Sequence, residues 1–460
     1  MQEQSKRLLS NTFFYTIGNF GAKFLILILL PFLSFYLSRA DLGIYDLMIT
    51  ALNLFVPVIT LQISDAVYRW ILPIKEDDQL IRKVVSNGFI LISGGVLFFQ
   101  VIFFLTSLFV DFKYKLFFSI MIITYCYLPF FQYVIRGVGK TKIYAIGSLL
   151  NAFSLLLLNV FFLVFFKLGI QSLFISVVLS NFLTILFYVF FGEVKKNLSV
   201  FSFEKNLLKE MLFFSVPLVP NTISWWLINA SDKFLILYFL NAEFNGIYAV
   251  STRFPSIMIL LNSVFILAWQ DHTITSLNSK NSFEEKVFDK YMNFEFSVVL
   301  FLISTSKYLI MFTVDGDFYD AYKYMPLLYL GVAYSAFSGF FGAAFLKVKN
   351  TKGVLVSSFF SGLINIILSF FLIPYIGLYA PALGTLVSFI FMFFLRVKQT
   401  KDFYFIKVNY SRLTYLTISC LSFAYLSFLD IKVVNIILIV VSVILLVVLN
   451  ANTIKKIINR

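Results

Sequence analysis

The sequence predicts an all-α polytopic membrane protein of about fourteen transmembrane helices, built as two pseudo-symmetric six-helix lobes and two extra C-terminal helices. Composition is the first reason: hydrophobic residues make up 60% of the 460 residues and charged residues only 13%. Soluble domains average about 45–50% apolar and about 25% charged residues. The second reason is a series of apolar runs long enough to cross a bilayer. The third is an internal repeat, in which residues 37–45 read LSRADLGIY and residues 240–248 read LNAEFNGIY.

The expected transmembrane helices follow from the apolar runs, because a helix needs roughly 20 apolar residues to cross the hydrocarbon core. The runs lie near 12–36, 44–66, 84–108, 115–135, 144–166 and 170–191, then near 211–239, 246–269, 293–314, 324–346, 354–375 and 378–395, and finally near 411–429 and 433–450. We therefore divide the chain into an N-terminal six-helix lobe at 1–192, a cytoplasmic connection at 193–210, a C-terminal six-helix lobe at 211–398 and two additional helices within 399–460. The first run lacks a small-residue cleavage site after it, so we expect a retained span and not a signal peptide.

Basic residues set the expected orientation. The formal net charge is +14, and most Lys and Arg lie in alternate connections, such as those around Lys140 and Arg396. The opposite connections carry few, and Lys307 is expected in one of them. By the positive-inside rule the rich connections are cytoplasmic, and an even number of spans places both termini in the cytoplasm. Confinement of the charge to short loops also argues against nucleic acid as a partner.

Sequence motifs for catalysis or metal binding are absent. His272 is the single histidine and is expected in a cytoplasmic connection, while Cys126 and Cys420 lie far apart in separate apolar runs. The sequence contains no P-loop, GxSxG or HExxH motif. We therefore expect no enzymatic activity, no metal and no cofactor. Energy for any transport would come from coupling to Na+ or H+, from the membrane potential or from the gradient of the substrate.

A polar stripe runs along the predicted helix at 44–66. Its members recur at steps of three and four residues, which places them on one helical face: Asp46, Thr50, Asn53, Pro57, Thr60 and Ser64. Such a face avoids lipid, so it either lines a water-filled cavity, which we favour, or packs against other helices through hydrogen bonds. Near the end of the same run, Asp65 and Arg69 are four residues apart and are expected to form a local salt bridge or a cytoplasmic gate.

Three basic residues lie inside predicted spans, namely Lys23, Lys233 and Arg253. Tyr15 and Asn19 share a helical face with Lys23. Ionisable residues inside a membrane cost roughly 2.5–3.5 kcal/mol each on insertion scales and are functional candidates by default. Because few acids compensate these cations, we expect them to bind an anionic ligand such as a phosphate group.

Each of these residues has a structural alternative. The cations would instead neutralise nearby acids, in pairs that join Lys23 to Asp46 or Asp65, and Asp232 to Arg253.

Two tryptophans, Trp225 and Trp226, shortly precede Asp232. They would stack on sugar rings, or serve as core or membrane-interface aromatics.

Three stretches of the chain are similar to one protein family. NTFFYTIGNFGAKFLILILLPFLSFYLSRADLGIYDL begins at Asn11, LQISDAVYRWILP at Leu61 and VPLVPNTISWWLINASDKFLILYFLNAEFNGIYAV at Val216. They resemble bacterial polysaccharide-transporter flippases of the multidrug/oligosaccharidyl-lipid/polysaccharide exporter superfamily. The likeness extends over nearly the whole chain.

The resemblance implies an inner-membrane protein that takes part in the biosynthesis of surface polysaccharide such as lipopolysaccharide. Its members flip an undecaprenyl-pyrophosphate-linked oligosaccharide, an O-antigen or capsule repeat unit, to the outer leaflet by alternating access. The implied partners are this lipid-linked oligosaccharide, membrane lipids, and a glycan polymerase with other assembly proteins. By analogy, Lys23, Lys233 and Arg253 would hold the pyrophosphate in a cationic cavity, and the last two helices would border a groove for the lipid tail.

Two other functions stay open. An ion-coupled multidrug or cation antiporter of the same superfamily would use buried carboxylates, so Asp46, Asp65 and Asp232, with Arg69, are candidates for gating or ion coupling. A membrane-embedded glycan polymerase or ligase is disfavoured, because such an enzyme would present a sizeable outer loop with acids or histidines, and the sequence has none.

Overall fold

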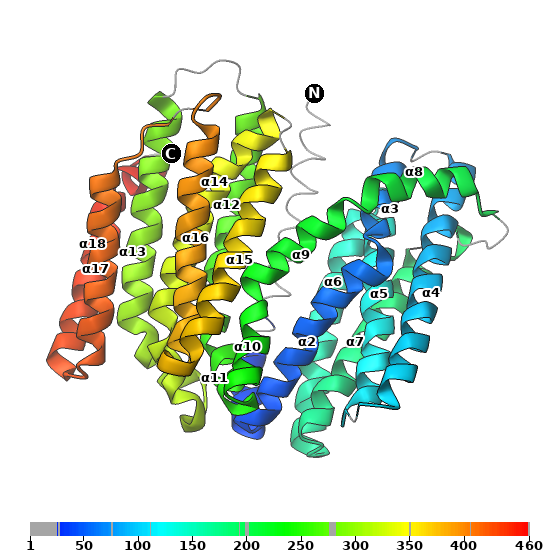
Figure 1. Cartoon of the computed structure of the whole chain (residues 1–460), viewed down its shortest axis with the longest axis horizontal. Coiled ribbons are helices and arrows are strands. Elements are labelled where there is room, and N and C mark those ends of the chain that lie inside the picture. The colour runs from blue at the N-terminus through cyan, green and yellow to red at the C-terminus, as the bar shows by residue number, and fades with distance from the viewer. Residues whose placement is uncertain are drawn as a thin grey trace. The chain divides into compact units, whose positions relative to one another are not determined.

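A computed structural model describes most of the chain (Figure 1). It describes Leu25 and residues 28–74, 77–110, 112–192, 194–197, 202–275, 282–348, 351–404 and 406–458. Across these residues the regular structure is helical and contains no strand. The chain divides into two compact units, Met1–Ile223 and Ser224–Arg460. The expected all-α, two-lobed membrane fold is therefore confirmed, while the finer boundaries drawn within the chain stay a prediction.

Unit 1 is a bundle of membrane-length helices joined by short turns. Its elements are α2 (Arg39–Thr60), α3 (Ile63–Ile71), η1 (Leu72–Ile74), α4 (Asp78–Ser107), α5 (Lys115–Gly137), α6 (Thr141–Val160), the π-helical η2 (Phe161–Phe165), α7 (Ile170–Phe191), η3 (Val194–Asn197), α8 (Lys205–Ser215) and the start of α9 (Leu218–Asn229). Helix α5 lies at the centre, since it packs against α2, α3, α4 and α7. Fully buried side chains such as Met121 and Phe130 form the core there.

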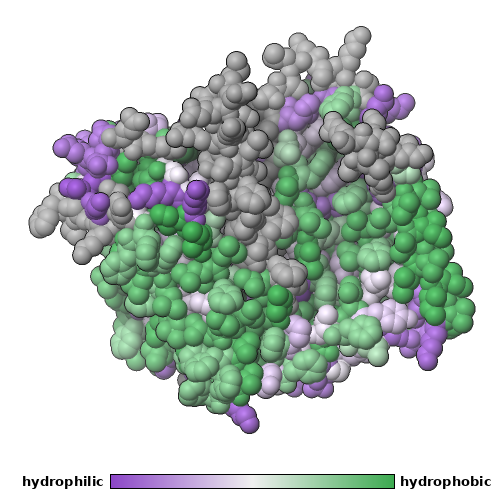
Figure 2. All heavy atoms as spheres, turned by 180° about the vertical axis from the view of Figure 1, so that it is seen from behind, coloured by the Kyte–Doolittle hydropathy of each residue, from purple (hydrophilic) through white to green (hydrophobic). Residues whose placement is uncertain are grey.

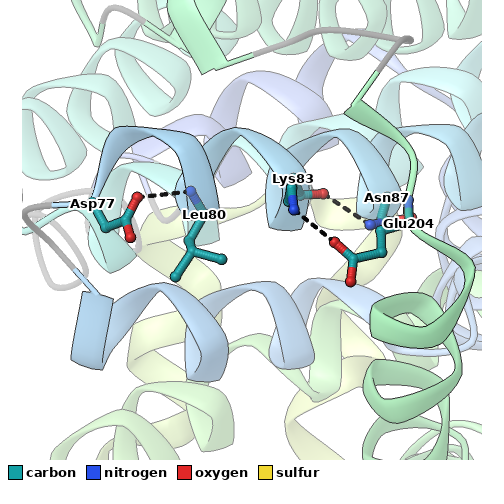
Figure 3. Close-up of polar contacts among 5 residues, drawn as sticks. All are labelled: Asp77, Leu80, Lys83, Asn87 and Glu204. Carbon is teal, nitrogen blue, oxygen red and sulfur yellow. Dashed lines mark hydrogen bonds and ion pairs between the residues drawn. The ribbon is translucent and has the colours of Figure 1, made fainter.

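Polar contacts fasten the start of α8 to α4 (Figure 3). Asp77 begins α4 by accepting the backbone N–H of Leu80 at 3.0 Å, as an N-cap does. Lys83 on α4 forms a 3.0 Å ion pair with Glu204, and the Glu204 N–H donates to Oδ1 of Asn87 at 3.2 Å. The ion pair is half-exposed, so the amide–backbone bond, which is shielded by the buried Asn87, is the firmer part of the attachment.

Unit 2 is built around α14. Its elements are α10 (Ser231–Phe239), α11 (Ala242–Ser251), α12 (Arg253–Thr275), α13 (Ser282–Thr313), η5 (Gly316–Lys323), α14 (Met325–Lys347), α15 (Thr351–Ile376), α16 (Tyr379–Thr400), α17 (Tyr410–Phe428) and α18 (Lys432–Ile458). Helix α14 packs against α12, α13 and α16 through an aromatic cluster that includes Phe337, Phe340 and Phe393. The two C-terminal helices pack on α13 and lie at the edge of the unit (Figure 1).

Twelve described helices are long and apolar enough to cross a membrane, judged by length and composition. They coincide with twelve of the expected spans. Most of the first expected span, 12–36, lies outside the described residues, although residues 28–36 are helical. The run at 411–429 forms α17, which is not among the twelve. Hydrophobic residues cover the middle of the helices and hydrophilic residues gather toward their ends (Figure 2), as expected of helices surrounded by lipid.

The repeat read from the sequence has the same local structure in both units. Ser38 caps α2 by accepting the N–H of Asp41, and the aligned Asn241 caps α11 by accepting the N–H of Phe244. A second pair of matched turns contains Gly169 and Gly377, whose φ angles of 57° and 56° lie in the region that favours glycine. Each unit therefore begins a helix and turns between two helices in the same way.

Candidate functional site

A helix breaks inside unit 2 next to the acidic residue singled out from the sequence. The expected span at 211–239 is not continuous: α8 ends at Ser215, α9 ends at Asn229, and α10 begins at Ser231. Pro217 lies at the first of these breaks, where a proline removes a backbone donor. Broken membrane helices leave polar backbone groups that line binding sites in many transporters.

Side chains satisfy the backbone at the second break. The Ser231 hydroxyl donates to the carbonyl of Leu227 at 2.5 Å, and Nδ2 of Asn365 on α15 donates to the carbonyl of Ile228 at 2.6 Å. Ser369 in turn donates to Oδ1 of Asn365 at 3.1 Å. Helix α16 closes over this pair at Gly384, where an added Cβ would lie 2.7 Å from Oδ1 of Asn365. The sequence did not indicate Asn365, Ser369 or Gly384. No local sequence pattern shows that an amide side chain donates a hydrogen bond to a helix far away in the chain.

Asp232 lies one residue beyond the start of α10 and is almost fully buried, with 3% of its surface exposed. Its Oδ2 accepts the Tyr248 hydroxyl of α11 at 2.6 Å, and its Oδ1 accepts the backbone N–H of Lys233 at 3.0 Å. Tyr248 is itself 1% exposed. Charge-assisted bonds of this length are about twice as strong as neutral ones. Tyr248 is the last residue of the repeated GIY triplet, so the repeat was a signal for it.

The predicted cations of unit 2 both follow this carboxylate in the sequence. Lys233 follows Asp232 directly, and Arg253 is the first residue of α12, just past the end of α11. Both side chains are partly exposed. Trp225 and Trp226 lie on α9, partly buried, and the ring of Trp226 packs against Phe234 with centroids 5.7 Å apart. The structure thus brings Asp232 and Tyr248 into contact and leaves Lys233 and Arg253 accessible.

The predicted residues of the first span cannot be placed. Lys23, with Tyr15 and Asn19 on its helical face, lies outside the described residues. Its pairing and its role in binding stay predictions.

In unit 1 the polar stripe of α2 faces the packed interior. Asn53 is exposed, whereas the other five members are buried. The hydroxyls of Thr50 and Thr60 donate to the carbonyls of Asp46 and Val56, one turn back, at 2.7 and 2.8 Å. The favoured water-filled cavity along this stripe is therefore wrong for the five buried members, because a hydroxyl that bonds to its own helix packs readily against a neighbour.

The helix at 44–66 is also interrupted. Helix α2 ends at Thr60, and Leu61 and Gln62 adopt left-handed φ angles of 49° and 53° before α3 begins at Ile63. Non-glycine residues adopt this region rarely, because Cβ approaches the backbone carbonyl. Gln62 donates from Nε2 to the Thr222 hydroxyl at 2.8 Å, which ties the interruption to α9 within unit 1. Asp65 and Arg69 therefore lie on a separate short helix.

Asp65 and Arg69 form no ion pair among the described residues, so the expected salt bridge is wrong. Asp65 instead interacts with Tyr133 and Arg136 of α5. Helix α3 is not among the candidate membrane spans. Partial burial raises the pKa of Asp65, and the Tyr133 hydroxyl and the Arg136 charge oppose that rise. Arg69 is exposed. Asp65 is directed toward α5, where Tyr133 and Arg136 lie, while Arg69 on the same short helix α3 is in contact with solvent.

Arg136 sits inside a cage of tyrosines at the end of α5. Its guanidinium carbon lies 4.8 Å from the ring centre of Tyr68 and 5.5 Å from those of Tyr133 and Tyr144. Cation–π contacts of this kind contribute about 0.5–2 kcal/mol each. The cage joins α3, α5 and α6, and it holds the positive charge next to Asp65.

Arg396 corrects the loop assignment made from the basic pattern. It is not in a loop but inside α16, with 2% of its surface exposed. Its guanidinium donates to the Ser338 carbonyl at 2.9 Å and to the Ser357 and Ser358 hydroxyls at 3.0 and 3.2 Å. These bonds join α14, α15 and α16. Lys307 was likewise expected in an outer loop, but it lies within α13 and pairs with Asp430, in the turn before α18.

The described residues contain no group of three or more His, Cys, Asp or Glu that could hold a metal ion. The polar features of the two units are instead helix breaks, a buried carboxylate and accessible cations.

Two lobes of membrane-spanning helices with interrupted helices inside them define the class of the protein, a helical membrane transporter fold. Residues 8–269 match the model of the polysaccharide biosynthesis protein family. Because this match covers more than half of the 460 residues, the chain belongs to that family. The family expected from the sequence motifs is thereby confirmed.

Solved structures share the fold. The structure titled "Lipid II flippase MurJ, inward closed conformation" is 15% identical with a TM-score of 0.74, over 96% of this chain and 99% of that one. An inward-facing multidrug resistance MATE family transporter of the MOP superfamily is 14% identical with a TM-score of 0.66, over 87% of this chain and 95% of that one. A comparison with curated proteins finds no significant match. At these identities the likeness establishes the fold alone.

Proposed function

We propose that this protein flips an undecaprenyl-pyrophosphate-linked oligosaccharide, an O-antigen or capsule repeat unit, from the cytoplasmic to the outer leaflet by alternating access. Membership of the polysaccharide biosynthesis family supports a glycan substrate. The fold shared with a protein titled a lipid II flippase supports movement of a lipid-linked one. On this proposal the protein works in the bacterial inner membrane with both termini in the cytoplasm, and it performs no chemistry on the substrate.

The observation that carries the proposal is the arrangement around the break in unit 2. Lys233 lies just after the helix break and Arg253 begins α12, and both residues are partly exposed. Arg provides a planar pair of donors and Lys a point charge, which together suit a pyrophosphate. Trp225 and Trp226 precede the break and provide aromatic faces for sugar rings. Lys23 is proposed to add a third positive charge.

Asp232 is proposed as the residue that couples transport to an ion gradient. Its carboxylate is buried beside the helix break between α9 and α10. Either Na+ or H+ suits such a site, since a carboxylate with nearby carbonyl oxygens binds a hard cation and also accepts a proton. No cofactor is needed for this step.

An ion-coupled multidrug antiporter is the second candidate. It is favoured by the burial of Asp232, because a carboxylate held in the membrane attracts cationic ligands, and by the fold shared with a multidrug resistance transporter. The two candidates differ in the sign of the charge that they bind.

A leaflet-resolved assay of labelled lipid-linked oligosaccharide tests the proposal. Cells that lack the protein are expected to accumulate the glycan on the cytoplasmic face, and the full-length chain is expected to restore its transfer. Normal surface glycan in those cells, together with altered sensitivity to cationic dyes, would contradict the flippase and support the antiporter. Purification of the full-length chain from the complemented cells would show whether a glycan polymerase or other assembly protein co-purifies with it.

A further inference from the structure

Another buried carboxyl group of unit 2 lies on a helix that the sequence analysis had not singled out. Glu295 is on α13, within the candidate membrane span Phe283–Thr313, and 1% of its surface is exposed. It lies five residues after Lys290, about 7.5 Å along the helix at 1.5 Å per residue. Its carboxyl is buried inside the protein, where an ionised group is costly unless it is paired.

Glu295 has too few partners to be stable as an anion. Its Oε2 accepts Nδ2 of Asn262 on α12 at 3.0 Å, and its Oε1 has no hydrogen-bond partner among the described residues. The structure gives it no ion pair with any described cation. Buried carboxylates are normally paired with a cation or accept several N–H or O–H donors. A neutral carboxyl in this place leaves one O–H group unsatisfied, which costs far less than a buried negative charge with a single amide donor.

A buried tyrosine hydroxyl that also lacks a described hydrogen-bond partner lies one helical turn away. Tyr291 is 5% exposed, and its hydroxyl also has no hydrogen-bond partner within the described chain. Residues four apart lie on one helical face, so Tyr291 and Glu295 are neighbours along α13. Phe265 of α12 stacks on the Tyr291 ring with centroids 4.0 Å apart. The carboxyl and the hydroxyl therefore share an aromatic environment between α12 and α13.

Described residues of α14 and α18 bring neutral polar groups to this part of α13. Tyr291 is a titratable group that interacts electrostatically with Glu295. On α14, the Tyr334 hydroxyl is engaged with Thr417 of α17 at 2.8 Å. On α18, Asn450 donates to the Ser297 hydroxyl at 3.0 Å.

We propose that Glu295, with Asn262 and Tyr291, is a proton-binding site of unit 2. In the conformation described here Glu295 holds its proton, and it releases that proton to water when a change in the packing of α12 and α13 hydrates it. The site is separate from Asp232, which lies on α10 and bonds to α11. The role of this site in transport rests on the proposed function, whereas the protonation state of Glu295 does not.

Infrared spectroscopy of the purified full-length protein in lipid nanodiscs tests the protonation directly. The carbonyl stretch of a neutral carboxyl group absorbs at a different frequency from the bands of a carboxylate, so the two protonation states can be told apart. We expect the wild-type protein to show such a band at neutral pH, and Glu295→Gln, which keeps an oxygen to accept the Asn262 amide, to lose it. Asp232→Asn is the matched control and is expected to retain the Glu295 band. An unchanged spectrum in Glu295→Gln would overturn the proposal.

Asn262→Leu gives a second variant in case Glu295→Gln fails to fold. Loss of the single donor is expected to shift the Glu295 band to higher frequency, because hydrogen bonding lowers a carbonyl stretch. A titration completes the test: the band is expected to disappear reversibly as the pH rises. A band that persists while the protein denatures would show a fixed structural proton, and a band removed by added Na+ at constant pH would show a cation site. Either result would overturn the proposal.

Transport measurements separate this proposal from the flippase function. If the protein is a flippase, Glu295→Gln is expected to flatten the pH dependence of glycan transfer while some transfer remains. If it proves to move another substrate, the infrared results still decide whether Glu295 binds a proton.

Discussion

The Tyr248 hydroxyl donates a 2.6 Å hydrogen bond to Oδ2 of Asp232, and it thereby joins α11 to the start of α10. Both side chains are almost fully buried. A hydrogen bond to a charged group contributes roughly 1.5–3 kcal/mol, because removing the donor leaves part of the charge unsolvated. The bond holds the carboxylate next to a break in the helix.

Tyr248→Phe removes this donor and little volume. We expect the free energy of unfolding to fall by about 1.5–3 kcal/mol and transport to fall with it. Thermal unfolding of the purified protein measures the first effect. Tyr238→Phe is the control, because Tyr238 lies on the same α10 but is 77% exposed. Equal stability of the two variants would show that the hydroxyl does not stabilise Asp232.

Gly384→Ala places a methyl group where α16 meets the polar pair on α15. The added Cβ would lie 2.7 Å from Oδ1 of Asn365 and 2.8 Å from the Ser369 hydroxyl. Overpacking of this kind costs about 1–3 kcal/mol. Gly94→Ala on α4 is the control: an added Cβ meets no atom within 4 Å there, so the better helix propensity of alanine is expected to leave stability unchanged or raised. A Gly384→Ala protein as stable as the control would contradict the tight approach.

Substitutions of Arg396 test how neutral hydrogen-bond acceptors stabilise a buried cation. Arg396→Lys keeps the charge but cannot reach all three oxygens on α14 and α15, so we expect a loss of about 3–5 kcal/mol. Arg396→Met removes the charge and most of the desolvation cost, and it is expected to be the milder change. Lys398→Met on the exposed side of the same helix serves as the control. The opposite order of Lys and Met would show that the charge itself stabilises the unit.

The tyrosine cage predicts a loss of stability that depends on the presence of Arg136. Tyr68→Leu removes the nearest ring from Arg136, and a loss of about 0.5–2 kcal/mol in unfolding free energy is expected. The effect should disappear in an Arg136→Gln background, since the cation is then gone. A Tyr415→Leu control, at a side chain that is 70% exposed, is expected to change little. A loss that persists without the cation would assign it to packing alone.

Charge reversal tests the proposed binding of pyrophosphate. Lys233→Glu and Arg253→Glu are each expected to reduce complementation of glycan transfer at least tenfold, because an acid repels the phosphate, while protein remains in the membrane. Lys401→Glu, an exposed residue in the turn after α16, is the control and is expected to retain activity. Full activity of both reversed variants would remove Lys233 and Arg253 from the site.

Sequence alone was enough for the class, for twelve of the fourteen expected spans and for the repeat. A chain with so many apolar residues is stable in lipid. Apolar runs of about 20 residues cross the bilayer as helices, because a helix satisfies its own backbone hydrogen bonds. Composition and the length of the runs therefore determine the fold class. The repeated LSRADLGIY and LNAEFNGIY stretches likewise determined two helix starts, because an N-cap depends on a few adjacent residues.

Tertiary structure decided which polar groups meet and where helices break. Asp232 was visible in the sequence, but its partner Tyr248 lies on the next helix, and Asn365, which satisfies the break before it, lies on α15. Arg396 resembled a loop residue because its local sequence is basic, and only the approach of Ser338, Ser357 and Ser358 shows why it can be buried. Hydrogen bonds between distant segments leave no local pattern in a chain, whereas transfer into lipid depends on local composition.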